Sequence, residues 1–179
     1  MNAVKGHTGS PVNNTNGKYP MRYRWRENFY GNQFMTTLDL ADLRVADGDS
    51  FHLDWYYLAD PRLYIPFGNY DKATIQDTSK GWVKLGVSTP VSSYVNGYVK
   101  TLGADSRYPH VRVPVLTSGG SDSTYYCDYA NLVYSHEVRC VRRGGNVTIG
   151  ASAGPCYFNA YDNVSIAAWH FGATLYMLQ

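Results

Sequence analysis

Acidic side chains that could bind a cation gather between positions 39 and 54: Asp39, Asp42, Asp47, Asp49 and Asp54. Their spacing lacks the 12-residue pattern of an EF-hand loop, so a solvated hairpin explains them better than a metal site. The three cysteines, Cys127, Cys140 and Cys156, form no CxxC pair and are odd in number, which indicates free thiols. No GxSxG elbow or comparable catalytic signature occurs. The sequence therefore predicts no catalytic residue, no metal and no cofactor.

The composition favours recognition of another surface. Charged residues make up 17% of the 179 residues and the formal net charge is +2, which does not indicate a nucleic-acid partner. No stretch approaches the 18 or so consecutive apolar residues of a membrane span, so membrane insertion is not expected. Aromatic residues make up 15%, and 17 residues are tyrosine, a side chain that offers rigid contact area and a hydroxyl.

Turn residues and short apolar runs divide the chain into an arm and one domain. Residues 1–18 are rich in Gly, Asn, Thr and Ser and predict a flexible arm or linker, followed by a domain over 19–179. A hairpin is predicted where Asp47-Gly48 separates two apolar runs, because Phe51, Leu53 and Trp55 alternate with polar residues after the turn. Further strands are predicted at 34–40, 43–46, 82–87, 94–102, 110–116, 125–129 and 138–141. Helix candidates lie at 27–37 and 72–79, and neither keeps a clean helical stripe.

Two blocks of sequence carry a resemblance to a known family. The segment YRWRENFYGNQF, residues 23–34, resembles the YRGxENxWGNxW segment of C-type-lectin-like domains in phage structural proteins and in relatives of formylglycine-generating enzymes. The segment VRCVRRGGNVTIGASAGPCYFNAYDNVSIAAWHFGATL, residues 138–175, is similar to the C-terminal pattern of the same family. STYYCDYA, residues 123–130, resembles a further phage segment. The resemblance implies an α+β class with a C-type-lectin-like fold, β-rich with short helices and long loops.

The C-terminal block also resembles variable proteins of diversity-generating retroelements. Eight residues stand where the family pattern has Asn, and adenine-directed mutagenesis can produce all eight. The resemblance implies a variable region over about 144–175. We expect its displayed, ligand-binding face to comprise Thr148, Ile149, Ser152, Tyr157, Tyr161, Asp162, Ile166, Ala168 and His170.

A binding face and an ordinary core strand pair compete as explanations of this segment. No Lys, Arg or Glu occurs from Gly144 to the end, while unlike side chains are interleaved with Gly and Ala. Such small residues permit the backbone angles of loops that display aromatic groups. Phe158, Trp169 and Phe171 are expected in the core, but Thr148 and the other polar members must be exposed or paired. The binding interpretation is therefore favoured.

These expectations define a non-enzymatic ligand- or receptor-binding domain. The resemblance implies a protein or glycan receptor on a host cell surface, and a virion or extracellular location after synthesis in the bacterial cytoplasm. Nucleic acid is not an expected partner. The alternative is a structural virion component, such as a head or tail decoration, that uses the same face to form a homo-oligomer such as a trimer. A degenerate enzyme of the formylglycine-generating type is a third, weaker alternative, because no cysteine pair of that type is present.

Overall fold

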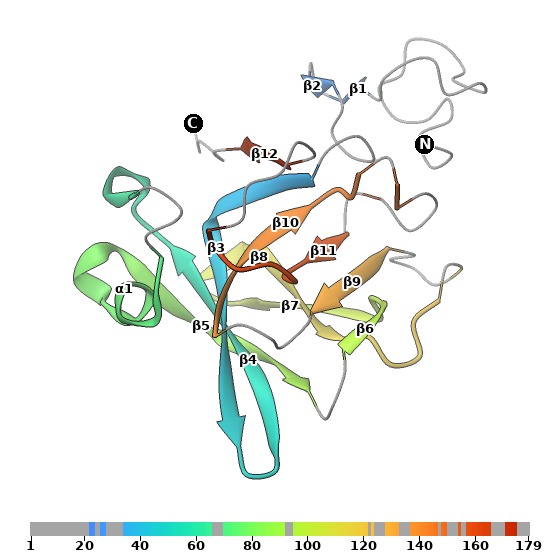
Figure 1. Ribbon diagram of the computed structural model, residues 1–179, viewed down its shortest axis with the longest axis horizontal. Coiled ribbons are helices and arrows are strands. Elements are labelled where there is room, and N and C mark those ends of the chain that lie inside the picture. The colour runs from blue at the N-terminus through green and yellow to red at the C-terminus, as the bar shows by residue number, and fades with distance from the viewer. Residues whose placement is uncertain are drawn as a thin grey trace.

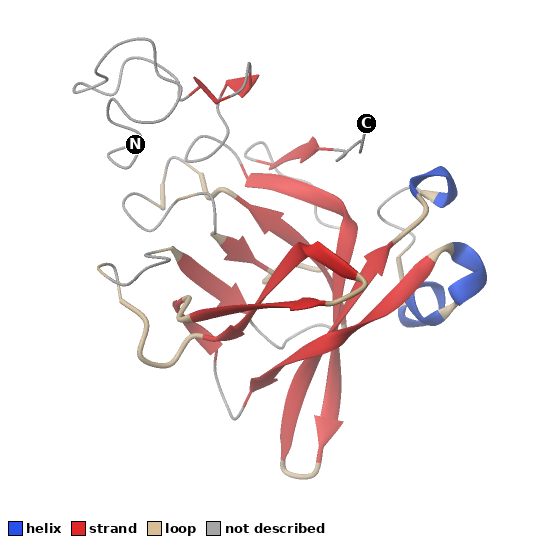
Figure 2. Cartoon of the chain, turned by 180° about the vertical axis from the view of Figure 1, so that it is seen from behind, coloured by secondary structure: helices blue, strands red, loops and turns tan. Residues whose placement is uncertain are grey.

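Strands dominate the part of the chain that can be described. The computed structural model describes residues 22–23, 26–27, 34–65, 70–91, 95–121, 123, 128–132, 137–146, 148–149, 154, 157–165 and 171–174. The predicted arm at residues 1–18 lies outside them. Figure 2 shows how little of the described chain is helical. No helix among these residues is long and apolar enough to cross a membrane.

A curled sheet forms the body of the molecule (Figure 1). Its strands follow the order β5-β4-β3-β10-β11-β9-β6, and β12 also pairs with β3. The bounds of these strands are β3 (Phe34–Asp47), β4 (Ser50–Leu58), β5 (Trp82–Val91), β6 (Val95–Tyr98), β9 (Tyr129–Leu132), β10 (Val138–Arg143), β11 (Phe158–Asn159) and β12 (Phe171–Thr174). A second hairpin consists of β7 (Thr101–Asp105) and β8 (Tyr108–Leu116), and a short one of β1 (Arg22–Tyr23) and β2 (Arg26–Glu27).

The predicted β3–β4 hairpin is confirmed. Asp47 pairs with Ser50 across a two-residue turn, and Gly48 has a φ of 59°, the left-handed conformation that this turn requires. The predicted alternation is also present, because Phe51, Leu53 and Trp55 are all buried on one face of β4. The local sequence therefore determines this part of the sheet.

The two faces of the sheet are covered by different elements. On one face, Leu53 and Trp55 of β4 pack in the same cluster as Val111 and Val113 of β8, so the β7–β8 hairpin closes over this face. On the other face, Ile75 of α1 (Lys72–Gln76) packs in a cluster with Leu58 and Trp82. Burying each such large side chain contributes about 1.5–3 kcal/mol relative to leaving it exposed.

The predicted α+β class is wrong, because the described residues are mostly strand and include a single α-helix, α1. Besides α1, the described residues contain two 3-10 turns, at Pro61–Leu63 and Thr78–Lys80. The candidate helix at 27–37 instead contributes the start of β3, where Phe34, Thr36 and Thr37 are buried between neighbouring strands. Burial on two sides suits β-branched Thr in a strand better than in a helix. The candidate helix at 72–79 is confirmed in part by α1.

Candidate functional site

A sharp change of direction in β3 shapes a pocket that described residues line. Ala41 pairs with Cys140 of β10, yet the next residue of β10, Val141, pairs with Thr37. Residues 38–40 of β3 therefore lie opposite the single peptide bond between Cys140 and Val141. The three extra residues form a large β-bulge. Figure 1 shows the consequence, since the ribbon of β3 turns sharply between its two halves. Bulges of this kind bend a strand and re-aim its side chains.

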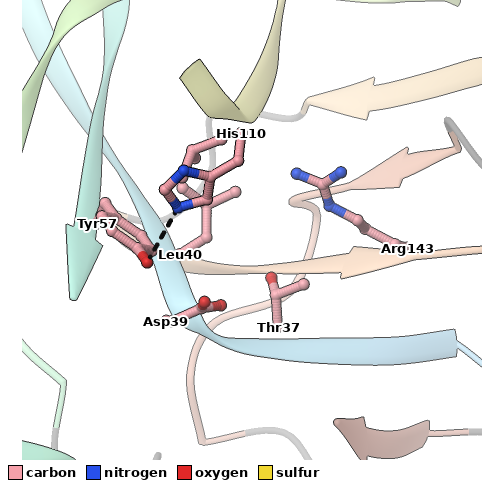
Figure 3. Close-up of a pocket in the computed structure, with 7 residues that line it drawn as sticks. Thr37, Asp39, Leu40, Tyr57, His110 and Arg143 are labelled. Atoms are coloured by element: carbon pink, nitrogen blue, oxygen red, sulfur yellow. Dashed lines mark hydrogen bonds between the residues drawn. The ribbon is translucent and has the colours of Figure 1, made fainter. Parts of the chain in front are cut away.

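A pocket of about 340 Å³ lies inside this bend. Figure 3 shows its side chains converging on one space from four strands. Thr37, Asp39 and Leu40 come from β3, Tyr57 from β4, His110 and Val111 from β8, and Arg143 from the end of β10. The volume falls at the lower end of the range for small-molecule sites, and the mixture of apolar walls with a few polar groups is typical of them.

The aromatic side of the pocket is held by ring contacts. Tyr57 packs against Tyr108 with ring centroids 5.1 Å apart and meets the ring of His110 edge-on at 5.7 Å. The hydroxyl of Tyr57 and Nε2 of His110 are 3.3 Å apart, within hydrogen-bonding distance (Figure 3). Because these contacts join β4 to β8, the phenol and the imidazole have fixed positions at the pocket wall.

Asp39 supplies a carboxylate from within the bulge. Burial raises the pKa of Asp39 above its ordinary value, and a hydrogen bond from its own backbone amide opposes that rise, followed by the charges of Arg143 and His110. The Tyr57 hydroxyl has a raised pKa as well, first because it is buried and then because the Asp39 carboxylate is near. Among the described residues, no side chain donates a hydrogen bond to this carboxylate. Asp39 is therefore available as a hydrogen-bond acceptor for a ligand.

Arg143 is held at the opposite wall. Its guanidinium carbon lies 4.2 Å from the ring centroid of Phe158, and its Nη2 donates to the carbonyl of Arg112 at 2.9 Å. Gly144 and Gly145 follow with φ of 85° and 69°, in the left-handed region. A residue with a Cβ would strain both positions.

The chemistry available to the pocket is hydrogen bonding with a balanced charge. It offers a carboxylate, a guanidinium, a phenol and an imidazole beside apolar walls. Nowhere in the described ranges do three or more His, Cys, Asp or Glu side chains come together as a metal site. Cys140 is buried, and burial raises the pKa of its thiol to about 12, so it is a poor nucleophile. The arrangement suits reversible binding of a polar ligand.

The structure spreads the described members of the predicted variable face over different environments. Thr148 and Tyr161 are exposed, the latter by 48%, and Ile149 is half-buried. Tyr157 is 2% exposed and packs 5.7 Å from the ring of Phe34, so its side chain is interior and not displayed. Asp162 forms an ion pair with the buried Arg142. The remaining predicted members lie outside the described residues: Ser152, Ile166, Ala168 and His170.

Backbone and glycine contacts hold the segment that follows β10. Asn163 bridges to Arg139, which places the segment alongside β10. The side chain of Asn159 accepts a hydrogen bond from the amide of Tyr161 at 3.0 Å. A Cβ at Gly154 would overlap the carboxylate of the buried Asp128. Small residues therefore do fit a tightly packed backbone here, as the sequence suggested.

Sequence reasoning missed most of the pocket. The sequence predicts that Asp39 and the other aspartates of this stretch lie in a solvated hairpin. Asp47 and Asp49 are indeed exposed. Asp42 and Asp54 are not, because they are 0% and 4% exposed. The alternation along β4 does place Tyr57 on the inward face. No local signal indicates that His110 lies beside it, because the two residues are 53 positions apart.

Comparison with known proteins adds no further constraint. No protein-family model, no curated protein and no solved structure matches the chain.

Proposed function

We propose that this chain is a non-enzymatic recognition domain whose described binding site is the pocket at the bend of β3. The single observation that carries the proposal is the convergence of Asp39, Tyr57, His110 and Arg143 on one cavity from four strands. Pockets with apolar walls and a few fixed polar groups are the usual form of small-ligand sites. Placing these groups on paired strands keeps their positions fixed before the ligand arrives, which reduces the entropic cost of binding.

The partner we propose is a protein or glycan receptor on a host cell surface. The sequence resemblance to phage and retroelement variable proteins supports this class of partner, together with a virion or extracellular location. Tyr161 supports a wider contact region, because it is an exposed aromatic side chain on the segment that follows β10. The pocket would then hold one group of the receptor, while the segment around Tyr161 contacts its surroundings.

The experiment compares two surfaces of the folded protein. Labelled full-length chain is applied to a panel of bacterial cells and to a glycan array. We expect Asp39→Asn and His110→Ala to remove most of the bound signal, while Asp49→Asn and His52→Ala, the matched controls outside the pocket, leave it unchanged. The melting temperature of each variant is compared with that of the wild type, to check that the fold is retained.

A separate variant tests the C-terminal segment. If Tyr161→Ala removes binding while both pocket variants keep it, the recognition surface lies on that segment and the pocket assignment is wrong. If pocket variants alone lose binding, the pocket is the site. If binding is lost in the pocket variants and in Tyr161→Ala alike, the pocket and the segment around Tyr161 form one continuous recognition surface.

A further inference from the structure

The charges of the pocket limit the ligand it can hold. One carboxylate, Asp39, and one guanidinium, Arg143, line the same cavity, and Arg143 acts electrostatically on Asp39. A ligand of net charge would meet a like charge on one of the two walls at close range. Because the charges of Asp39 and Arg143 are opposite, the pocket favours a ligand without net charge.

The hydrogen-bonding groups limit it further. A carboxylate accepts only and a guanidinium donates only, whereas the Tyr57 hydroxyl and the His110 imidazole can each do both. Hydroxyl groups both donate and accept, so a ligand that carries several of them can satisfy all four side chains at once. Asp39 is especially suited, because two carboxylate oxygens can accept from two neighbouring hydroxyls.

The apolar wall provides the remaining constraint. Leu40, Val111 and the ring of Tyr57 line the cavity next to the polar groups, and Leu40 and Tyr57 belong to the buried core. The ring of Tyr57 cannot swing away, because Tyr108 and His110 pack against it. A small ring with C–H groups on one face and hydroxyls at its edge matches such a wall. The volume of about 340 Å³ suits one ring better than an extended chain.

We infer that the pocket at the bend of β3 binds a single uncharged sugar ring, the terminal residue of a surface glycan. This inference rests on the proposed recognition function and names the ligand class of that site. Asp39 accepts from two adjacent hydroxyls of the sugar, Arg143 donates to another oxygen, and the C–H face of the ring lies against Leu40, Val111 and Tyr57.

The probes are methyl pyranosides of glucose, galactose, mannose and N-acetylglucosamine, with glycine and alanine as zwitterionic competitors. Full-length chain is titrated with each by calorimetry and saturation-transfer NMR. We expect at least one pyranoside to bind with a millimolar Kd, as befits a small ligand, and neither amino acid to bind. Asp39→Asn should weaken the binding about tenfold or more, since a hydrogen bond to a charged group is lost. Asp49→Asn should leave it unchanged.

Acidification supplies a second readout. Protonation turns one of the two carboxylate oxygens of Asp39 into a hydroxyl donor and removes the charge, so affinity should fall as the pH is lowered. The titratable and charged groups near Asp39 are Arg143 on β10, His110 on β8, Tyr57 on β4 and Tyr70, which precedes α1. To assign the loss to Asp39, it must persist in His110→Ala and disappear in Asp39→Asn. An acid-induced loss that Asp39→Asn retains would contradict the assignment of Asp39 to the sugar.

Failure of the inference can be separated from failure of the proposed function. If an amino acid binds and no pyranoside does, the ligand class is wrong and the pocket remains a binding site. If a pyranoside binds equally to wild type, Asp39→Asn and His110→Ala, the sugar occupies another surface and the inference is overturned. If no probe binds but the pocket variants lose cell binding, the sugar is excluded and the recognition function stands. If neither probes nor cells depend on the pocket, both proposals fall.

Discussion

The two halves of β10 place their arginines in different surroundings. In the first half, Arg139 is 0% exposed and binds Asp42, which is 0% exposed as well, with an Nη2–Oδ2 distance of 2.7 Å. In the second half, Arg142 is equally buried, but the side chain of its partner, Asp162, keeps 17% exposure. Arg143 follows and reaches the pocket. One strand thus carries a fully buried charge pair, a charge pair with one partly exposed member, and a guanidinium that lines the pocket.

The difference indicates that the first half of β10 contributes more to the stability of the fold than the second half, which lies next to the pocket. Oδ1 of Asp42, and Nε and Nη1 of Arg139, are buried without a hydrogen-bond partner in the described part of the chain. If either member of this pair is removed, the other charge cannot reach water, so the energetic cost is high. Asp162 can turn toward water when its arginine is removed. The first half of β10 is therefore expected to tolerate substitution much less than the second.

The largest effect is expected for Arg139→Met. This change leaves the Asp42 carboxylate buried and without its partner, so the free energy of unfolding should fall by about 3–5 kcal/mol. Urea denaturation measures the loss. The double variant Asp42→Leu/Arg139→Met should recover most of it, because an apolar pair of similar volume replaces the charges. A double variant no more stable than the single one would show that the pair is not what makes this position sensitive.

A smaller effect is expected for Arg142→Met. Because Asp162 is partly exposed, the free energy of unfolding should fall by only about 1–3 kcal/mol. The segment from Asn159 to Asn163 should also exchange its amide hydrogens faster, since the ion pair helps to hold it against β10. Hydrogen exchange followed by mass spectrometry measures this. A loss as large as that of Arg139→Met would remove the contrast between the two halves.

The smallest effect is expected for Asp39→Asn, as a change in how the free energy of unfolding depends on pH. The folded protein holds the Asp39 proton more tightly than the unfolded chain, because burial raises the pKa of this carboxyl. Between the unfolded and the folded pKa, stability from this residue therefore falls as pH rises and is regained on acidification. Asp42, whose pKa burial raises to about 6, contributes a slope of the same sign in both proteins and cancels from the comparison.

Urea denaturation at several values from about pH 4 to 7 tests the point. The wild type should gain stability relative to Asp39→Asn as the pH is lowered. Equal slopes for the two proteins would mean that the Asp39 carboxyl is hydrated like a surface group, and would weaken its assignment to the pocket wall.

Local features of the sequence were predictable and long-range ones were not. The β3–β4 hairpin follows from its turn residues and from the alternation beyond them. The bend at 38–40 depends on the register with β10, about a hundred residues later, so no local pattern encodes it. The same distance hides the partner of Asp42, which is 97 positions away. Within the acidic stretch, composition alone could not separate the exposed aspartates from the buried ones.

The predicted site was tied to one segment, whereas the pocket is assembled from four strands. Arg143 lies in the segment that carries the resemblance, and among the pocket residues it is the nearest in sequence to the predicted face. Tyr157 illustrates the limit of composition, since a tyrosine among small residues suggested display but packs against Phe34. A side chain with both apolar area and a hydroxyl suits interior and surface alike, so its sequence context does not decide between them.

The pairing of β12 with β3 has a consequence for synthesis on the ribosome. Phe171 pairs with Phe34 in a parallel register, and the other edge of the same stretch of β3 pairs with Val141–Arg143. Both neighbours of this stretch therefore emerge more than a hundred residues after it, and contacts of such separation form slowly. The hairpin β3–β4 and its neighbour β5 can assemble early, while the corner that shapes the cavity must wait until β10 and β12 have been translated. A ribosome stalled before residue 138 would carry a partly formed sheet with no cavity.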